Sequence, residues 1–297
     1  MTLASILQQL PQQLLNGLVV GSSFTLNALG MTLILGMLDL INFAHGEFFS
    51  LGAFIALTLA VVLKLPYLLS VALAIVVVGF IGMASERLAF RPLRSAPRLS
   101  LLISSLGLSI FLQNLAQLIW GPDPRDFSSP FLKLSVEFFG FSVNGQRVLI
   151  FGLALGLIGL LYVLIQRTDV GIAMRACAYD LQTASLLGVR TDLVVMLTFM
   201  VGAALAAAAG ALLGPVFTVY PTMGLAAKMK AFVVVVMGGI GNISGAIWSG
   251  FILGMVETLA AGFISSQYKD AIAFIVLILV LVFKPTGLFV RSSVEKV

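Results

Sequence analysis

Long apolar stretches recur along the chain, and they limit its fold more than any other feature. A helix that crosses the hydrocarbon core of a bilayer needs about 20 mostly apolar residues. Strands of alternating apolar and polar residues, typical of membrane barrels, do not occur. In lipid only helices and closed barrels satisfy every backbone polar group, so we expect helices. The expected spans are residues 14–36, 48–64, 68–85, 99–120, 147–166, 193–214, 224–241, 243–262 and 270–284.

The composition indicates the same class of protein. Hydrophobic residues make up 60% of the chain and charged residues only 10%, whereas a soluble domain carries about 25% charged residues. We therefore predict an all-α, polytopic membrane bundle of about eight or nine spans, forming one domain over residues 1–297 and in contact with membrane lipid. The net charge of +5 is ordinary for basic cytoplasmic loops and does not indicate nucleic acid.

Two polar or glycine-rich segments interrupt the apolar stretches. Residues 37–47 read GMLDLINFAHG, and residues 238–245 read GGIGNISG. Both predict a broken helix or a tight turn at membrane depth. Such backbone is tolerated in lipid only where it is buried in protein or lines a wet cavity.

Basic loops predict the orientation of the spans, because cytoplasmic loops carry an excess of Lys and Arg. Four arginines lie in residues 86–98, ERLAFRPLRSAPR, which places that loop in the cytoplasm. Residues 167–192 follow two spans later on the same side, and residues 121–146 form an outer excursion with turns and a short hairpin. Counting 224–241 as a short span places the basic tail, with Lys284, Arg291 and Lys296, in the cytoplasm as well. The N-terminus then lies outside.

The loop over residues 167–192, RTDVGIAMRACAYDLQTASLLGVRTD, is larger and more polar than a connection between spans requires. Asp180 and Gly188 are start and stop signals that predict a short helix over residues 181–187. Such a helix offers a surface to a partner in the aqueous phase, and the alternative is a solvated amphipathic connector. The candidate contact residues are Arg175, Asp180, Ala184, Leu187 and Gly188.

A few polar residues at membrane depth are candidates for the lining of a transport path, since ionisable groups in a membrane are costly and often functional. The alternative is structural: they bond backbone groups that the helix breaks leave free, and we favour this alternative for Asn42 and Asn242. Further polar residues at depth include Asp39, Asn114 and Glu257. The candidates for the path are Asn42, His45, Glu47, Gln113, Gln117 and Asn242.

The sequence carries no pattern that indicates an enzyme. It has no phosphate-binding loop, no serine nucleophile elbow and no HExxH motif. With a single histidine, His45, a histidine-cluster metal site is excluded, and a single cysteine, Cys177, excludes an internal disulfide. We therefore expect no catalytic residues, no bound metal and no cofactor.

Three segments resemble a known family. They are GLVVGSSFTLNALGMTLILGMLDLINFAHGEFFSLGAF (17–54), RTDVGIAMRACAYDLQTASLLGV (167–189) and KAFVVVVMGGIGNISGAIWSGFILG (230–254). They are similar in order and spacing to the inner-membrane permeases of branched-chain amino acid ABC importers, the LivH type. The resemblance implies a helical fold of the vitamin B12/sugar-permease type in a bacterial inner membrane. It also implies four kinds of neighbour or ligand: a second, LivM-like permease subunit, two cytoplasmic ATPases, a periplasmic binding protein and a hydrophobic amino acid.

On this interpretation the chain works by alternating access, and the ATPases act on the 167–192 loop. The rival interpretation is a secondary transporter or channel, driven by an ion gradient, for small polar solutes such as urea or amides. It requires coupling carboxylates within the chain, and the candidates are sparse: Asp39, His45, Glu47 and Glu257.

Overall fold

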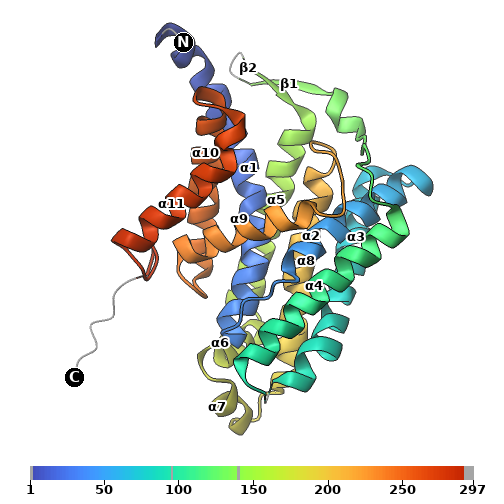
Figure 1. Ribbon diagram of the computed structural model, residues 1–297, viewed down its shortest axis with the longest axis vertical. Coiled ribbons are helices and arrows are strands. Elements are labelled where there is room, and N and C mark those ends of the chain that lie inside the picture. Colours follow the sequence, from blue (N-terminus) through green and yellow to red (C-terminus); the bar gives the residue numbers. More distant parts are fainter. Residues whose placement is uncertain (1–2, 95, 139–140, 291–297) are drawn as a thin grey trace.

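The structure is a computed structural model that describes residues 3–94, 96–138 and 141–290, most of them helical (Figure 1). The predicted tail residues Arg291 and Lys296 lie outside the described residues. The helices are α1 (Leu3–Leu38), α2 (His45–Leu57), α3 (Tyr67–Ser85), α4 (Arg98–Trp120), α5 (Gly145–Arg167), α6 (Asp169–Tyr179), α7 (Leu181–Leu186), α8 (Thr191–Leu213), α9 (Met223–Gly238), α10 (Ile243–Phe263) and α11 (Lys269–Phe283). Two strands, β1 (Ser135–Phe138) and β2 (Phe141–Asn144), pair antiparallel.

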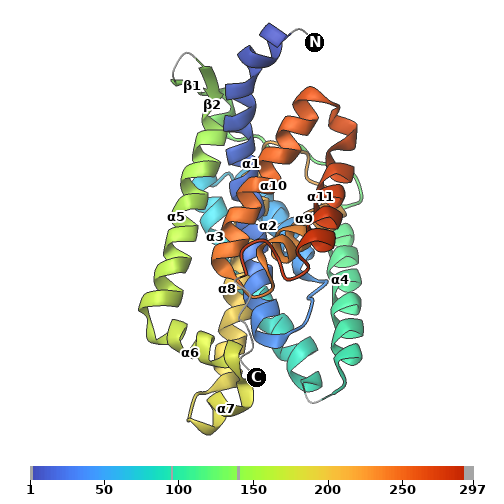
Figure 2. The same cartoon turned by 90° about the vertical axis from the view of Figure 1, so that its left-hand side faces the viewer.

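Eight helical stretches of the described chain are long and apolar enough to cross a membrane, which agrees with the predicted number of spans. They lie at Gln9–Leu38, His45–Val62, Tyr67–Leu93, Arg98–Trp120, Gly145–Arg167, Thr191–Leu213, Ile243–Phe263 and Ser266–Phe283. The bundle has two distinct ends (Figure 2): the hairpin end carries β1 and β2, and the loop end carries α6 and α7. The short hairpin predicted within residues 121–146 is therefore present.

The predicted span over residues 224–241 is not among the eight, and here the prediction was wrong in part. Helix α9 has only 16 residues, too few for a full crossing at 1.5 Å per residue. Non-helical chain precedes it, and Val219 pairs with Arg125 in the segment that leads to the hairpin. After α9, Gly241 contacts Gly36 near the end of α1. Extended chain and a short helix together therefore replace the expected long helix.

Ion pairs join the two polar loops at the loop end. Arg94 lies 2.7 Å from Asp192 at the start of α8, and Arg94 also pairs with Glu86. Arg98 lies 2.8 Å from Asp39, just after α1. The arginine-rich loop, the end of α1 and the start of α8 thus share one end of the bundle, as the charge pattern predicted.

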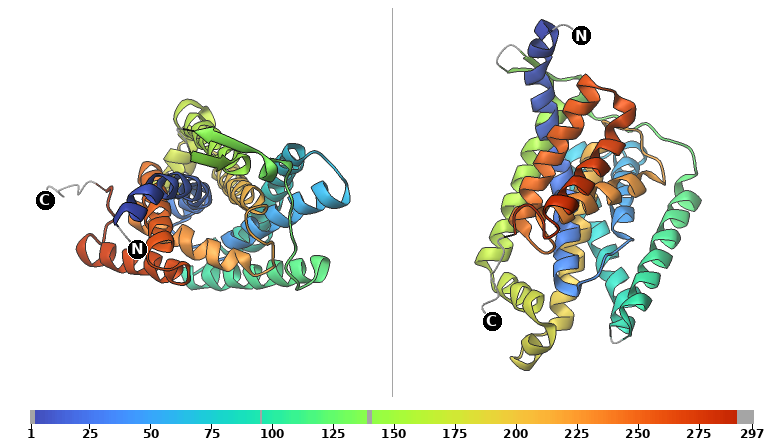
Figure 3. Two further views of the ribbon diagram at one scale, coloured as in Figure 1. Left: turned by 90° about the horizontal axis from the view of Figure 1, so that it is seen from above. Right: turned by 60° about the vertical axis from the view of Figure 1, so that its left-hand side comes forward.

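Glycines allow the central helices to approach closely, as small residues do in lipid. A Cβ at Gly21 would lie 2.9 Å from the Phe251 Cα, so α1 and α10 pack backbone to backbone. The glycines Gly152 and Gly156 of α5, four residues apart, behave differently, since a Cβ at either position meets nothing within 4 Å. These two glycines of α5 therefore do not pack within this chain, whereas Ala154 between them is fully buried. Seen from the hairpin end, α4, α9 and α11 lie along one side of the bundle and α5 lies on the opposite side (Figure 3).

Both predicted helix breaks are present. Asp39, at a φ of 49°, follows the last turn of α1, and non-helical chain leads to α2. At the second break Gly239 and Gly241 have φ values of 95° and 75°, which only glycine adopts freely. Asn242 caps α10 by accepting the Gly245 N–H at 3.0 Å. Its amide also donates to the Phe289 carbonyl at 3.2 Å, so Asn242 ties the chain after α11 to the break.

Candidate translocation site

The first break starts a cluster of polar side chains in the middle of the bundle. Gly46 brings α2 against α9, because a Cβ there would overlap the Gly224 carbonyl oxygen. Asn42 accepts the Ala44 N–H at 2.9 Å, and its own amide nitrogen has no partner. His45 Nε2 lies 2.9 Å from the Asn27 carbonyl oxygen. Asn42 thus has the structural role that we favoured for it, which is to stabilise the start of α2.

A chain of hydrogen bonds continues this cluster across three helices. Ser109 of α4 donates to Glu47 Oε1 at 2.9 Å, and Lys228 of α9 donates to the Ser109 hydroxyl at 3.4 Å. Glu47 is 3% exposed and Lys228 is 7% exposed, so water is largely excluded. We call Asn42, His45, Glu47, Ser109 and Lys228 the buried polar cluster.

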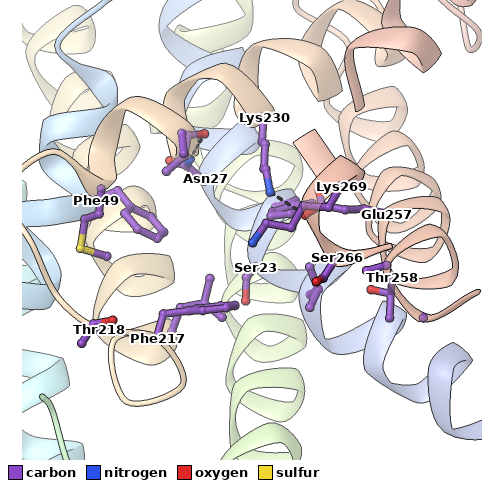
Figure 4. A pocket seen from close by; sticks show the side chains of 18 of the residues that line it. Ser23, Asn27, Phe49, Phe217, Thr218, Lys230, Glu257, Thr258, Ser266 and Lys269 are labelled. Carbon is purple, nitrogen blue, oxygen red and sulfur yellow. Dashed lines mark hydrogen bonds and ion pairs between the residues drawn. The ribbon is translucent and has the colours of Figure 1, made fainter. Parts of the chain in front are cut away.

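A cavity of about 630 Å³ lies on the other side of α9 (Figure 4). Its walls come from α1, α2, α8, α9, α10 and α11 and from the segments that join α8 to α9 and α10 to α11. We call it the large cavity. Its volume falls in the range of about 300–1,000 Å³ that small-molecule sites occupy. Much of the lining is apolar, and its largest apolar side chains are Val20, Phe24, Phe49, Leu213, Phe217 and Met223.

Charged side chains gather at one side of the large cavity. Lys230 Nζ lies 2.5 Å from Glu257 Oε1 and 3.0 Å from Asp270 Oδ1. Glu257 Oε2 is buried and has no hydrogen-bond partner. Lys269 also lines the cavity, with Nζ 5.9 Å from the centre of the Phe217 ring. Figure 4 shows the side chains of Lys230, Glu257 and Lys269 close together.

We predicted six residues for the lining of the transport path. None of them is part of the lining of this cavity. Asn42, His45 and Glu47 belong to the buried polar cluster, and Asn242 caps α10 at the loop end. Gln113 and Gln117 are half-buried side chains of α4, one turn apart. The three break residues are therefore brought together, but the glutamines and Asn242 lie elsewhere. The assignment of these residues to the path stays a prediction.

The lysines of the cavity were missed, although the sequence carried a signal for one of them. Lys230 stands in an apolar stretch, and Glu257 stands in the next. Opposite charges on neighbouring spans are expected to pair, because an isolated charge in lipid is costly. Lys269 gave no such signal, because it begins a span, where lysine is common.

The predicted short helix of the loop is present as α7. Asp180 caps it, accepting the N–H groups of Gln182 and Thr183 at 2.8 and 3.0 Å. Hydrogen bonds from Thr183 hold the pKa of this exposed carboxyl below its usual range. Gly188 ends the helix at a φ of 86°, where Val189 N–H bonds the Ala184 carbonyl at 3.1 Å. Both boundary signals are confirmed.

Two of the predicted contact residues face their own chain. Ala184 is 3% exposed and packs in a cluster with residues of α6 and α8, so it offers no surface to a partner. Arg175 donates to the Ile165 carbonyl and joins α6 to the end of α5. Leu187 is 79% exposed. Its neighbours Leu186 and Tyr179, which were not predicted, are 88% and 93% exposed.

Comparison with known proteins places the chain in a family. Residues 13–281 match the family described as branched-chain amino acid transport system, permease component. The chain is 44% identical over 301 residues to the high-affinity branched-chain amino acid transport system permease protein BraD of Pseudomonas aeruginosa, covering 96% of this chain and 97% of BraD. No solved structure matches the chain.

Two further relatives extend the likeness. The permease protein LivH of Escherichia coli (strain K12) is 42% identical over 299 residues, with 96% of this chain and 97% of LivH covered. The probable branched-chain amino acid transport permease protein LivH of Methanocaldococcus jannaschii is 30% identical over 295 residues, with 93% and 92% covered. With its eight candidate spans and these relatives over nearly its whole length, this chain belongs to the family of branched-chain amino acid transport permeases.

Proposed function

We propose that this chain is a permease subunit of an ATP-driven importer that carries branched-chain amino acids across a bacterial inner membrane. The identity of 44% to BraD over nearly the full length of both proteins carries this proposal. The large cavity supports it, because apolar walls beside a charged group suit a small amphipathic solute. The fold is proposed to be of the vitamin B12/sugar-permease type.

The proposal includes partners that the chain itself does not supply. They are a second, LivM-like permease, two cytoplasmic ATPases and a periplasmic binding protein. The loop end would face the cytoplasm, because the arginines of residues 86–98 lie there. Leu288 N–H bonds the Met237 carbonyl at 2.7 Å, so the chain after α11 returns to the second break, and we place the C-terminus in the cytoplasm too.

Helix α7 would be the element that receives force from the ATPases. Its ends are fixed by the Asp180 cap and by Gly188, and the buried Ala184 anchors it to this chain. Tyr179, Leu186 and Leu187 are left exposed as an apolar surface in a polar loop. A short helix that is held in this way can transmit a push as a rigid body.

We propose that alternating access moves the solute, with the helix breaks as hinges. The sequence assigned Asn42, His45, Glu47, Gln113, Gln117 and Asn242 to the path, whereas for the three break residues Asn42, His45 and Glu47 we now propose a structural role, because their side chains are buried. The relatives are transport permeases and do not favour the rival, an ion-gradient-driven carrier or channel for urea or amides.

The test is uptake of L-leucine into proteoliposomes that hold the complete transporter. We expect uptake to require enclosed ATP and the binding protein, and to continue when ion gradients are collapsed. Uptake that survives without ATP but stops with the gradient would contradict the proposal and favour the rival.

The coupling surface is tested by Leu187→Asp, with Leu187→Met as the matched control. Loss of a packed interface contact costs about 1–3 kcal/mol, so the aspartate variant should release the ATPases during purification, while the methionine variant should retain them. Because Leu187 is exposed, both variants should insert and fold normally. Retention of the ATPases and of full coupled hydrolysis by Leu187→Asp would exclude this surface.

A further inference from the structure

The charges of the large cavity are incompletely paired. Lys230 has two carboxylate neighbours, Glu257 at 2.5 Å and Asp270 at 3.0 Å. Glu257 uses one oxygen for this pair, and its other oxygen, Oε2, is buried without a partner. A buried carboxylate oxygen without a hydrogen bond is costly. An additional donor, supplied by a ligand, would remove this cost.

Lys269 is a positively charged group of the same cavity that, like Glu257 Oε2, is incompletely paired. Among the residues that the structure describes, no carboxylate oxygen lies within 4 Å of its ammonium. Its nearest recorded partner is the ring of Phe217, at 5.9 Å from the ring centre. Lys269 is half-buried at the start of α11 and lines the same cavity as Glu257. The cavity therefore presents an acceptor for a cation and a donor for an anion.

A free amino acid carries both charges on groups that are attached to one carbon, the Cα. We propose that Glu257 Oε2 accepts a hydrogen bond from the α-ammonium of the substrate, while the Lys269 ammonium binds the α-carboxylate. Lys230 holds Glu257 in place through its contact with Oε1. This assignment rests on the proposed function, to which it adds a binding site and a requirement that the substrate be a zwitterion.

The remaining walls fit the rest of such a substrate. Phe24, Phe49 and Met223 form an apolar lining that suits a branched aliphatic side chain. The turn between α10 and α11 lies toward the hairpin end of the bundle (Figure 2), and its Ser266 lines the cavity together with Thr218. On the proposed orientation that end faces the binding protein, so the cavity is where a released amino acid would first enter the permease.

The experiment uses a thiol reporter in the cavity of the complete transporter in membrane vesicles. Cys177 is buried and is replaced by Cys177→Ala, and Ser266→Cys supplies an exposed reporter in the lining. A membrane-impermeant thiol reagent is applied with one of three probes. L-leucine is the zwitterion, 4-methylpentanoate lacks the ammonium, and 3-methylbutylamine lacks the carboxylate. We expect L-leucine to protect the thiol and the two half-ligands to fail.

Two variants test the assigned groups, and a third serves as the control. Losing a hydrogen bond to a charged group weakens binding about tenfold or more, so Glu257→Gln and Lys269→Gln should each raise the half-protecting leucine concentration by that factor. Lys269 is near the surface, so its variant should fold even if the Glu257 variant does not. Asp270→Asn removes a carboxylate that does not line the large cavity. It should change the half-protecting leucine concentration less than about twofold.

The outcomes separate this inference from the proposed function. Normal ATP-driven leucine uptake without protection, or with protection unchanged in both variants, would overturn the cavity assignment and leave the function intact. Protection by leucine without any ATP-driven uptake would overturn the proposed function and leave the cavity assignment intact. Protection by the amine alone, or by phosphoethanolamine in place of leucine, would also overturn it, because the site would then accept a simple cation or a lipid head group.

Discussion

Two lysines of α9, two residues apart, face different surroundings. Residues i and i+2 of a helix point about 200° apart, so Lys228 and Lys230 lie on opposite faces. Lys228 points into the buried polar cluster, where Ser109 links it to Glu47. Lys230 points into the large cavity, where it contacts Glu257 directly at 2.5 Å.

The difference shows how a membrane helix can use the same residue type for structure and for function. In the buried polar cluster nearly every charged atom is enclosed by protein, and the cluster joins α2, α4 and α9. In the large cavity, among the described residues, one carboxylate oxygen has no hydrogen-bond partner and one ammonium has no carboxylate within 4 Å, and space for a solute adjoins them. Paired and enclosed charges hold helices together, whereas incompletely paired charges beside a cavity are available to a ligand.

The largest effect should come from Lys228→Met. It leaves the buried Glu47 carboxylate without the ammonium that Ser109 links to it, and an uncompensated buried charge of this kind costs about 3–5 kcal/mol. We expect a large fall in the midpoint of unfolding by dodecyl sulfate, together with less assembled protein in the membrane. The control is Lys230→Met, which should destabilise less because a second ammonium, that of Lys269, lies close to Glu257 in the large cavity.

A second variant checks the cause of that loss. Glu47→Gln combined with Lys228→Met replaces both charges and should recover most of the stability, since no unpaired charge remains. Equal destabilisation by Lys228→Met and Lys230→Met would show that the two lysines do not differ in the way that we propose.

A smaller effect is expected for Glu47→Gln alone. The amide can still accept the Ser109 hydroxyl, but Lys228 loses its anion, which should cost about 1.5–3 kcal/mol. We expect less assembled protein and unchanged leucine uptake per assembled molecule. Uptake that falls at constant amounts of assembled protein would instead place Glu47 on the path, as the sequence predicted.

The features that the sequence predicted well are those that depend on local chemistry. Apolar stretches of membrane length, glycines that allow positive φ at the second break, and the Asp180 and Gly188 boundaries of α7 all act within a few neighbouring residues. The arginines of the loops predicted that residues 86–98 and 167–192 lie at the same end of the bundle, because an excess of basic residues can be read from each loop by itself.

The features that were missed depend on which way a side chain points. Helix α9 is apolar on nearly every face, so its sequence has no stripe that shows which neighbours Lys228 and Lys230 meet. Ala184 was assigned to a partner, but α7 is too short to define an inner face by its pattern. The large cavity gathers Phe24, Lys230 and Glu257 from three separated helices, and no local rule brings these residues together.

The smallest effect is expected for Phe217→Leu, which changes the large cavity and leaves the buried polar cluster as it is. Phe217 is half exposed, and its ring faces the Lys269 ammonium at 5.9 Å, an arrangement worth about 0.5–1 kcal/mol at an exposed site. Phe217→Leu keeps an apolar wall and removes the ring, so Lys269 becomes less well placed. The half-protecting concentration of L-leucine for Ser266→Cys should rise about two- to fivefold. Unfolding should be unaffected, because no enclosed charge loses its partner. The ring of Phe43 lies 5.9 Å from the Lys228 ammonium of the buried polar cluster. If removing that ring raised the half-protecting leucine concentration by a similar factor, ring–cation contacts away from the cavity would also affect binding. The proposed difference between the two lysines would then be wrong.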